Sequence, residues 1–289
     1  MKINQYLDNL DDLTGKKVII TGGTSGIGLW IVRHLLYKHA KVVILARNQN
    51  KAEEVKTLLS SEYPNASIEF IKYNQSNFAS IKEASEEILK NHKDFYALIL
   101  NAGVFARSNK TSEVSMTIQT NLVGVYQLVE ALLPNLNEPH RFIFQGSFAA
   151  RMRYKKIKSF SLKEQKISDF QQYIISKSGV EALFYHYAST SEGPLSFLLA
   201  EPGFTSTDIV RDLPTPIRQL GKVFMKIVSH SPKKAALTAL KALDSSVTNG
   251  AFIVPRGFRN YMGYPKIKDF PKKRRKPQLL ELLSKDSAA

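Results

Sequence analysis

Cysteine is absent from this sequence of 289 residues, which excludes disulfide bonds and thiolate metal sites. Histidine is also scarce, and its six copies show neither the HxxxH nor the HxH spacing of a zinc site. They occupy positions 34, 39, 92, 140, 186 and 230. We therefore expect no bound metal ion.

Long apolar runs are missing as well, and no run approaches the ~18 residues that are needed to span a bilayer. The first twelve residues, MKINQYLDNLDD, are polar and acidic. A secretory signal peptide would instead begin with cations and continue into an apolar segment. The expected protein is cytoplasmic and has no transmembrane segment.

Acidic residues are few beside the basic ones, 25 against 41, which leaves a net charge of +16. A positive balance of this size favours anionic partners, among them phosphorylated cofactors, acidic substrates, anionic lipid and nucleic acid. Lysine-rich usage throughout the source organism explains the same number without any partner. Charge therefore bears on binding and leaves the fold open.

No Gly/Ser-rich or Pro-rich linker and no internal repeat divides the chain, so we expect a single domain over residues 1–255. Seven short apolar runs separate longer segments of helical periodicity, and continuous runs are typical of strands buried on both faces of a parallel sheet. They are residues 17–21, 41–46, 68–73, 96–101, 141–146, 195–200 and 251–254. The pattern predicts a doubly wound α/β fold with a seven-stranded, mainly parallel sheet and helices on both faces.

Two segments interrupt this alternation of strands and helices. Residues 148–170 form a polar, basic insert between the fifth strand and the helix that follows it. Residues 256–289 form a basic C-terminal extension, which contains the stretch KDFPKKRRKP. Both are expected to lie outside the regular repeat of the fold.

The first expected strand leads into the loop TGGTSGIG, residues 21–28, and the loop leads directly into a helical segment. Gly22 permits a sharp turn, Gly26 lets a pyrophosphate approach the backbone, and Gly28 lets the helix pack closely on the sheet. The helix N-terminus adds free N–H groups and the positive end of a dipole. The loop therefore predicts a dinucleotide site. Its expected cofactor-binding residues are Gly22, Thr24, Ser25, Gly26, Ile27 and Gly28.

The second expected strand continues into Ala46 and Arg47, and no carboxylate follows until Glu53. An NAD site would place Asp or Glu near this position to accept hydrogen bonds from the ribose hydroxyls. The guanidinium of Arg47 can instead bind the 2′-phosphate of NADP. A solvated start to the next helix is the alternative explanation for Arg47. We expect NADP (NADPH) to be preferred over NAD.

The glycine loop, the motif LNAG at residues 100–103 and the pair Tyr173 and Lys177 in YIISK follow one another on the expected elements. Through these motifs, roughly residues 14–255 resemble the short-chain dehydrogenase/reductase family. The resemblance implies a Rossmann fold. It also implies an oxidoreductase that transfers a hydride between a nicotinamide and a carbonyl or alcohol substrate.

A catalytic set follows from the same resemblance. Tyr173 is similar to the family's acid/base, and Lys177 to the residue that binds the nicotinamide ribose and lowers the pKa of the tyrosine. Ser147 resembles the serine that hydrogen-bonds the substrate oxygen, and Asn121 the helix asparagine that holds a water in a proton relay. Taken without the family, Ser147 could cap a strand end, Asn121 could bond to backbone, and Tyr173 could be an ordinary helix residue.

Further cofactor contacts are implied only by the resemblance. The segment 101–103 is similar to one that lines the adenine ribose, and the loop 202–207 to one at the nicotinamide end. Asn74 stands where the family commonly has an aspartate beside the adenine, and its amide can still read a base edge. The residues concerned are Asn74, Asn101, Ala102, Gly103, Pro202, Gly203 and Thr207.

The chemistry of these residue types agrees with the implied reaction. Reduction of a carbonyl leaves an alkoxide that needs a proton, and a tyrosine with a pKa of about 10 is a usable acid but a poor base at neutral pH. A cation one helical turn away favours the phenolate and lowers that pKa. A hydroxyl beside the oxyanion stabilises the developing charge.

Tyr173 follows Ser147 by 26 positions, a longer separation than in many family members. Together with ARNQNK, it resembles the branch of retinol-dehydrogenase-like and protochlorophyllide-reductase-like enzymes. That branch implies an apolar carbonyl or alcohol substrate. The insert is strongly basic, so an acidic substrate is a second hypothesis beside a solvated loop. Its cations are Arg151, Arg153, Lys155, Lys156 and Lys158. Residues 208–232 occupy the family's usual lid position, although they could equally pack on the core.

The basic cluster at residues 272–276 could bind nucleic acid or an anionic membrane, but it lacks interleaved aromatics and a solvated tail is the simpler explanation. We expect a small-molecule substrate, no nucleic acid, and a homo-oligomer as one option. Two other functions stay open. A silent NADP-binding sensor or scaffold would lose Ser147, Tyr173 or Lys177, yet all three are present. A nucleic-acid-associated protein would act through residues 266–276.

Overall fold

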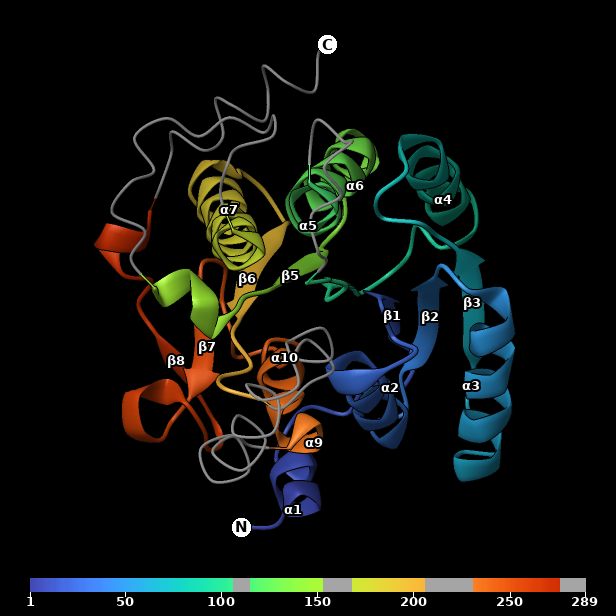
Figure 1. The fold of residues 1–289 in the computed structure, drawn as a ribbon. Helices are drawn as coiled ribbons and strands as arrows, with labels where there is room; N and C mark the ends of the chain where they lie inside the picture. Colours follow the sequence, from blue (N-terminus) through green and yellow to red (C-terminus); the bar gives the residue numbers. More distant parts are fainter. Residues whose placement is uncertain (106–114, 153–167, 206–230, 276–289) are drawn as a thin grey trace, which may run out of the picture.

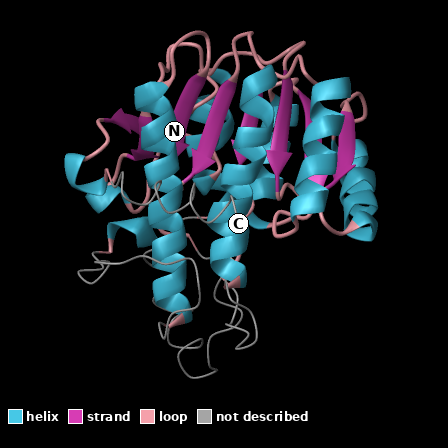
Figure 2. Cartoon of the chain, turned by 90° about the horizontal axis from the view of Figure 1, so that it is seen from above, coloured by secondary structure: helices cyan, strands magenta, loops and turns pink. Residues whose placement is uncertain are grey.

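An eight-stranded sheet forms the centre of the computed structural model, which describes residues 1–105, 115–152, 168–205 and 231–275 (Figure 1). The strand order is β3-β2-β1-β4-β5-β6-β7-β8, in which β1 to β7 are parallel and β8 is antiparallel to β7. Helices cover both faces of the sheet (Figures 1 and 2). The predicted doubly wound α/β fold is confirmed, with one strand more than the sequence predicted.

The elements have the following bounds. The strands are β1 Lys17–Thr21, β2 Lys41–Ala46, β3 Ile68–Lys72, β4 Ala97–Leu100, β5 Arg141–Gln145, β6 Ser196–Ala200, β7 Phe252–Pro255 and β8 Pro265–Lys268. The α-helices are α1 Ile3–Asp8, α2 Gly26–Tyr37, α3 Gln49–Glu62, α4 Phe78–Asn91, α5 Met116–Ile118, α6 Gly124–Leu132, α7 Asp169–Thr190, α9 Pro232–Ala235 and α10 Leu237–Lys241. A π-helix, η1, spans Gln119–Val123, and short 3₁₀ turns include η3 Phe148–Arg151 and η6 Lys272–Arg274.

Two hydrophobic clusters lie on opposite faces of the sheet. Successive side chains of β1 illustrate the division, because Val18 and Ile20 join the cluster with α2, α3 and α10, whereas Ile19 joins the cluster with α4, α6 and α7. A strand that is buried on both faces needs apolar residues at every position. This is the physical reason why the central strands are continuous apolar runs.

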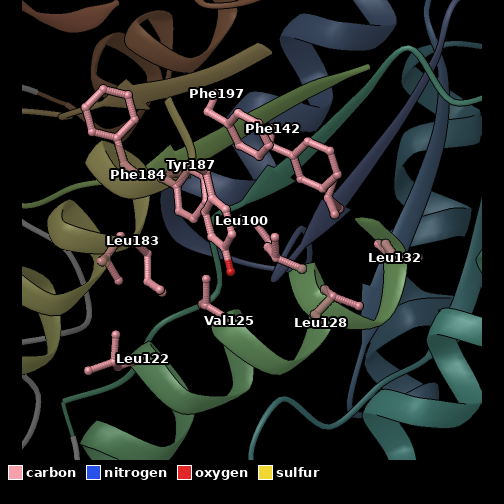
Figure 3. Close-up of a cluster of buried hydrophobic side chains, with 14 of the residues drawn as sticks. Leu100, Leu122, Val125, Leu128, Leu132, Phe142, Leu183, Phe184, Tyr187 and Phe197 are labelled. Atoms are coloured by element: carbon pink, nitrogen blue, oxygen red, sulfur yellow. The ribbon is translucent and has the colours of Figure 1, made fainter. Parts of the chain in front are cut away.

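The second cluster holds the long helix α7 in place against the strands (Figure 3). Tyr187 of α7 stacks on Phe197 of β6 with ring centroids 5.3 Å apart, and Phe197 stacks on Phe142 of β5 at 5.2 Å. Each buried aromatic side chain removes roughly 150–250 Å² of surface from water. This packing fixes the position of α7, the helix that carries Tyr173 and Lys177, relative to β5 and β6.

The described part of the C-terminal extension is packed on the sheet, although the sequence placed it outside the domain. Residues 265–268 form β8 at the sheet edge, where the sequence PKIK is rich in lysine and Ile267 is 48% exposed. Phe270 is buried in the cluster that contains α7, and the Arg274 side chain is also buried. The strand was missed because a short, half-solvated edge strand lacks the continuous apolar run of its neighbours.

Candidate active site

The residues predicted to bind a dinucleotide gather beyond the carboxyl ends of the parallel strands. The strand order reverses between β1 and β4, so the crossovers from these strands leave toward opposite faces. In open α/β sheets, ligands bind outside the carboxyl ends of the strands at such a switch point. The loops that follow the parallel strands therefore share one candidate site.

Gly22 and Gly28, in the glycine loop between β1 and α2, are both closely packed. Gly22 has a φ of +70°, and a Cβ there would lie 2.9 Å from the Cα of Ala102. A Cβ at Gly28 would overlap the carbonyl oxygen of Gly22 and lie 2.6 Å from Nδ2 of Asn101. These contacts give a physical reason for glycine at the turn and at the helix–sheet contact.

The same loop has room for a phosphate group at its third glycine. Gly26 has a φ of +54°, and a Cβ there would meet no atom within 4 Å. Ser25, the N-cap of α2, makes no side-chain capping bond to the first turn of the helix. An open glycine at the start of a helix of 12 residues suits the pyrophosphate of a dinucleotide, which the helix N–H groups and dipole would attract. The residues present therefore fit such a cofactor.

The segment after β4 supports the glycine loop by hydrogen bonds. Nδ2 of Asn101 donates to the carbonyl oxygens of Thr21 and Gly22 at 3.1 and 3.2 Å. The backbone N–H of Ala102 donates to Oγ1 of Thr21 at 2.9 Å. Gly103 is the next residue, and a Cβ added to it would lie 3.3 Å from Nζ of Lys177. The predicted motif thus lies between the glycine loop and Lys177.

Ser147 and Tyr173 are brought together across 26 residues of sequence. The Ser147 Oγ and the Tyr173 hydroxyl oxygen are 3.4 Å apart, close enough for either hydroxyl to donate. Ser147 also accepts a bond from the backbone N–H of Ala149 at 3.2 Å, so it caps η3 as well. The ring of Phe105 meets the Tyr173 ring edge-on at 5.6 Å and restricts its orientation. Two hydroxyls that face one point can share a single ligand oxygen.

Burial raises the pKa of Tyr173 above its ordinary value, and the hydrogen bond with Ser147 opposes part of that change. A buried phenolate is disfavoured because the low-dielectric interior solvates charge poorly. The sequence predicted instead that Lys177 would lower this pKa. In the protein chain itself desolvation is the larger effect, so Tyr173 is held in its protonated form at neutral pH.

Lys177 is buried one helical turn after Tyr173 on α7, as the spacing of the pair predicted. Its Nζ donates to the carbonyl oxygen of Gln145, at the end of β5, at 3.1 Å. Burial lowers the pKa of Lys177 to about 8, and the charge of Glu181 acts in the opposite direction. The lysine is therefore positioned by the strand that leads to Ser147.

Asn121 lies in the π-helix η1 and is fully bonded to protein groups. Its Oδ1 accepts from the N–H of Val104 at 2.7 Å, and its Nδ2 donates to the Val104 carbonyl at 2.8 Å and to Ser176 Oγ at 3.1 Å. This is the backbone-bonding role that the sequence left open as an alternative. Single-turn π-helices are frequent at functional sites, and here one aims the asparagine at the segment after β4. The relay role of Asn121 stays a prediction.

The other predicted cofactor residues that the structure describes also follow the carboxyl ends of the strands. Arg47 is exposed directly after β2, whose Leu45 carbonyl accepts from the N–H of Gly22 at 3.2 Å. Asn74 follows β3, and its Oδ1 accepts from the Ser76 hydroxyl at 2.9 Å. Residues 202–203, Pro202 and Gly203, are buried after β6. Thr207, the insert residues 153–158 and the lid residues 208–230 lie outside the described part of the chain.

Gln75 was not predicted from the sequence, although it joins three parts of the site. Its Nε2 donates to the carbonyl oxygens of Ala102 at 3.2 Å and Thr120 at 2.7 Å. A Cβ at Gly124 would overlap the Gln75 carbonyl oxygen, so α6 packs directly on this residue. A glutamine after a strand carries no sequence signal for such a bridge, which depends on the packing of η1 and α6.

Two basic residues have a different environment from the one predicted. Arg151 was predicted as a cation of a substrate-facing or solvated insert, but it pairs with Glu201. Arg274 was predicted in a solvated or nucleic-acid-binding cluster, but it is buried and pairs with Glu181 and Glu201. Both positive charges are therefore compensated within the fold, whereas Lys272 and Lys273 beside Arg274 are exposed.

Within the described ranges, no group of His, Asp and Glu side chains is arranged to hold a metal ion. Over the same part of the chain, no helix combines the length and the apolar character that crossing a membrane requires.

Comparison with known proteins identifies relatives over most of the chain. The family model for short chain dehydrogenases matches residues 16–217. A short-chain dehydrogenase/reductase of Armillaria gallica is 30% identical over 266 residues, which cover 86% of this chain and 84% of that protein. Another from Emericella nidulans is 27% identical over 272 residues, 86% of each chain.

Solved structures with the same fold include a protein of Mycobacterium paratuberculosis, with a TM-score of 0.71, 21% identity, and coverage of 97% of this chain and 96% of that one. A short-chain dehydrogenase of Shigella flexneri in complex with NADP has a TM-score of 0.63 and 19% identity, and covers 82% and 94%. One from Burkholderia phymatum in complex with NAD has a TM-score of 0.61 and 18% identity, and covers 80% and 86%. At these identities the likeness concerns the fold.

Proposed function

The chain belongs to the short-chain dehydrogenase family, and from this premise we propose that it is an NADP(H)-dependent oxidoreductase acting on a carbonyl or alcohol group of a small molecule. Tyr173 is the proposed acid/base. The observation that carries the proposal is the pair of hydroxyls, Ser147 Oγ and Tyr173 Oη, 3.4 Å apart beside the buried Lys177. The hydroxyl pair can bind the oxygen of a substrate carbonyl from two directions.

Each side chain has a distinct part in this reaction. When bound, the nicotinamide supplies or accepts the hydride. Tyr173 donates a proton to the oxygen of the substrate, and burial supports this role because it raises the pKa of Tyr173 and keeps the hydroxyl protonated at neutral pH. Ser147 hydrogen-bonds the same oxygen and stabilises its developing negative charge. Lys177 stabilises the phenolate that remains, and these protonation states favour carbonyl reduction.

The aromatic side chains near the hydroxyl pair support an apolar substrate. The Phe105 ring packs edge-on against Tyr173 at 5.6 Å, and Phe148 follows Ser147 directly. The rings of Phe204 and Tyr261 meet Phe148 at 6.1 and 4.9 Å. We propose a carbonyl or alcohol substrate with a hydrophobic body, as in the retinol-dehydrogenase-like branch. The acidic-substrate hypothesis is weaker for Arg151, since Glu201 compensates that charge.

The proposed preference for NADP over NAD depends on Arg47. Arg47 follows β2, which pairs in parallel with β1, so it lies at the same ends of the strands as the glycine loop. This position suits the adenine ribose end of a dinucleotide. A guanidinium there attracts a 2′-phosphate, and no carboxylate in the following turn repels it. Of the solved structures with the same fold, the Shigella flexneri one is in complex with NADP and the Burkholderia phymatum one with NAD, so Arg47 is the residue to test.

Replacing Arg47 by alanine is expected to raise the KM for NADPH by about 10- to 100-fold, the range for loss of a hydrogen bond to a charged group. The KM for NADH is expected to change little, because NADH lacks the 2′-phosphate. The measurement is oxidation of both cofactors in parallel against a panel of aldehydes, ketones and quinones. This assay also tests the proposed activity of the wild-type protein.

Lys51→Ala provides the matched control, since it removes another exposed cation from the first turn of α3. If any nearby positive charge attracted the anionic cofactor equally well, both variants would raise the KM for NADPH by the same factor. The assignment fails if Arg47→Ala leaves the KM for NADPH unchanged, or if Lys51→Ala raises it as much.

A further inference from the structure

A chain of buried ion pairs connects the loops of the candidate site, and the reaction steps proposed for Tyr173, Ser147 and Lys177 do not use it. Arg151 pairs with Glu201, Glu201 with Arg274, and Arg274 with Glu181. Nε of Arg274 donates to Glu181 at 2.8 Å, and its Nη2 donates to Glu201 at 3.1 Å. Nε of Arg151 donates to Glu201 at 3.2 Å. Two arginines and two glutamates make the chain neutral as a whole.

Glu181 belongs to the same helix as the catalytic pair. Tyr173, Lys177 and Glu181 follow one another at intervals of four residues on α7, so their side chains lie along one face of the helix. Lys177 is thus flanked by the proposed acid/base on one side and by a carboxylate on the other. The two flanking groups are the nearest ionisable neighbours along the helix.

The other members connect this helix to the remaining catalytic loops. Glu201 directly precedes the loop 202–203 after β6, and Arg151 ends the turn η3 that begins after Ser147. Arg274 comes from η6, 93 residues from Glu181 in sequence. Arg274 of the C-terminal segment therefore joins α7 to the end of β6, and the Arg151–Glu201 pair joins that point directly to the turn after Ser147.

Such an arrangement needs an explanation beyond stability. Glu181 is 1% exposed, Glu201 0% and Arg274 8%, and removing each ion from water costs several kcal/mol. The Arg274 guanidinium also lies near the rings of Phe252 and Phe270, at 5.0 and 5.5 Å. Apolar residues of similar volume would stabilise such a position at least as well. A buried carboxylate one turn from a catalytic lysine is informative because its charge acts on that lysine.

We propose that Glu181 is a positioning residue for the catalytic pair: its carboxylate keeps the buried Lys177 charged, and Arg274 holds that carboxylate in place. The consequence for catalysis rests on the proposed function, whereas the electrostatic effect on Lys177 does not. A charged Lys177 is the form that stabilises the phenolate of Tyr173. Without Glu181, burial would act on the lysine unopposed.

The balance of forces on Lys177 supports this role. Burial lowers the pKa of Lys177 to about 8, and Glu181 is the charge that raises it again. The Gln145 carbonyl oxygen accepts a hydrogen bond from Nζ at 3.1 Å. On the elements around the lysine, the ionisable or charged groups nearest to it in the fold are Tyr173 and Glu181 on α7, Arg151 on η3, Glu201 after β6 and Arg274 on η6. The same elements also carry Asp169, Tyr185, His186 and Tyr187 on α7, Arg141 on β5, and Lys272 and Lys273 on η6.

The test is Glu181→Gln, which keeps the shape of the side chain and removes its charge. The pKa of Lys177 is expected to fall by about one pH unit, the lower end of what a nearby opposite charge contributes, because burial would then act on the lysine unopposed. The readout is the ¹³Cε NMR shift of Lys177 as a function of pH in the cofactor-free protein, assigned by its absence from Lys177→Arg. The alkaline limb of the pH–rate profile is expected to move down by the same amount.

Glu201→Gln is the matched control, since it removes the other carboxylate that binds Arg274 and leaves Glu181 in place. It is expected to lower the thermal unfolding temperature as Glu181→Gln does, but to leave Lys177 near its wild-type pKa. If Glu181→Gln fails to fold, Glu181→Gln with Arg274→Met removes the whole pair and is expected to show the same lowered pKa. The inference is overturned if the pKa of Lys177 is the same in Glu181→Gln as in the wild type, or if it falls equally in Glu201→Gln. A lysine that titrates as expected beside an unmoved pH–rate profile leaves the inference standing and contradicts the proposed role of Lys177.

Discussion

Tyr173→Phe is expected to lower kcat/KM for carbonyl reduction by about a thousandfold, within the range of 10² to 10⁴ that proton transfer by a positioned group contributes. The phenyl ring keeps the packing against Phe105, whose centroid lies 5.6 Å from that of Tyr173. Only the hydroxyl that faces Ser147 is lost. The dissociation constant of NADPH, measured by its fluorescence, is expected to change little.

Tyr185→Phe is a suitable companion variant, because Tyr185 lies on the same helix, three turns farther along, and stacks on Phe270 away from the hydroxyl pair. Its kcat/KM is expected to stay close to the wild-type value. If Tyr173→Phe retained full turnover, Tyr173 could not be the proton donor. If both variants lost activity together, the effect would belong to α7 as a whole.

Gly28→Ala is expected to reduce the free energy of unfolding by about 3 kcal/mol, at the upper end of the cost of overpacking. The added methyl would overlap the Gly22 carbonyl oxygen and lie 2.6 Å from Nδ2 of Asn101. Neither neighbour can withdraw easily, since Asn101 is hydrogen-bonded to Gly22 and Thr21. The measurement is urea-induced unfolding, and loss of NADPH binding is expected to accompany it.

Gly26→Ala gives the contrast within the same loop. Its methyl would meet no protein atom within 4 Å, so only the left-handed φ of +54° opposes it, at about 1 kcal/mol. The open space is where the pyrophosphate is expected, and binding of NADPH should therefore weaken far more than stability does. Equal losses of stability in the two variants would refute the distinction between a packing glycine and a phosphate-facing one.

The central part of the fold could be predicted from the sequence because its physical demands are local. Strands buried on both faces need continuous apolar residues, and the glycine loop needs small residues at fixed positions between a strand and a helix. The four-residue spacing of Tyr173 and Lys177 is common to any helix. Its meaning came from its place after the strand that ends near Ser147, and the structure does bring the two hydroxyls together.

The features that were missed depend on contacts between distant parts of the chain. β8 is a lysine-rich edge strand that is recognisable only beside β7. The ion pair of Arg274 with Glu181 joins residues 93 positions apart, and a run of cations near the C-terminus is indistinguishable by composition from a solvated tail. The bridge from Gln75 to Thr120 depends on the π-helix, for which the sequence carries no signal.

The most direct test of the proposed function follows the transferred atom itself. The wild-type protein would be incubated with NADPH deuterated at C4, on either face of the nicotinamide in separate experiments, and with the best carbonyl substrate of the panel. One of the two labelled cofactors is expected to deliver deuterium to the former carbonyl carbon of the alcohol product, as read by mass spectrometry and NMR. An alcohol product without the label from either cofactor, or bound NADPH that is never oxidised by any carbonyl, would contradict the proposed activity.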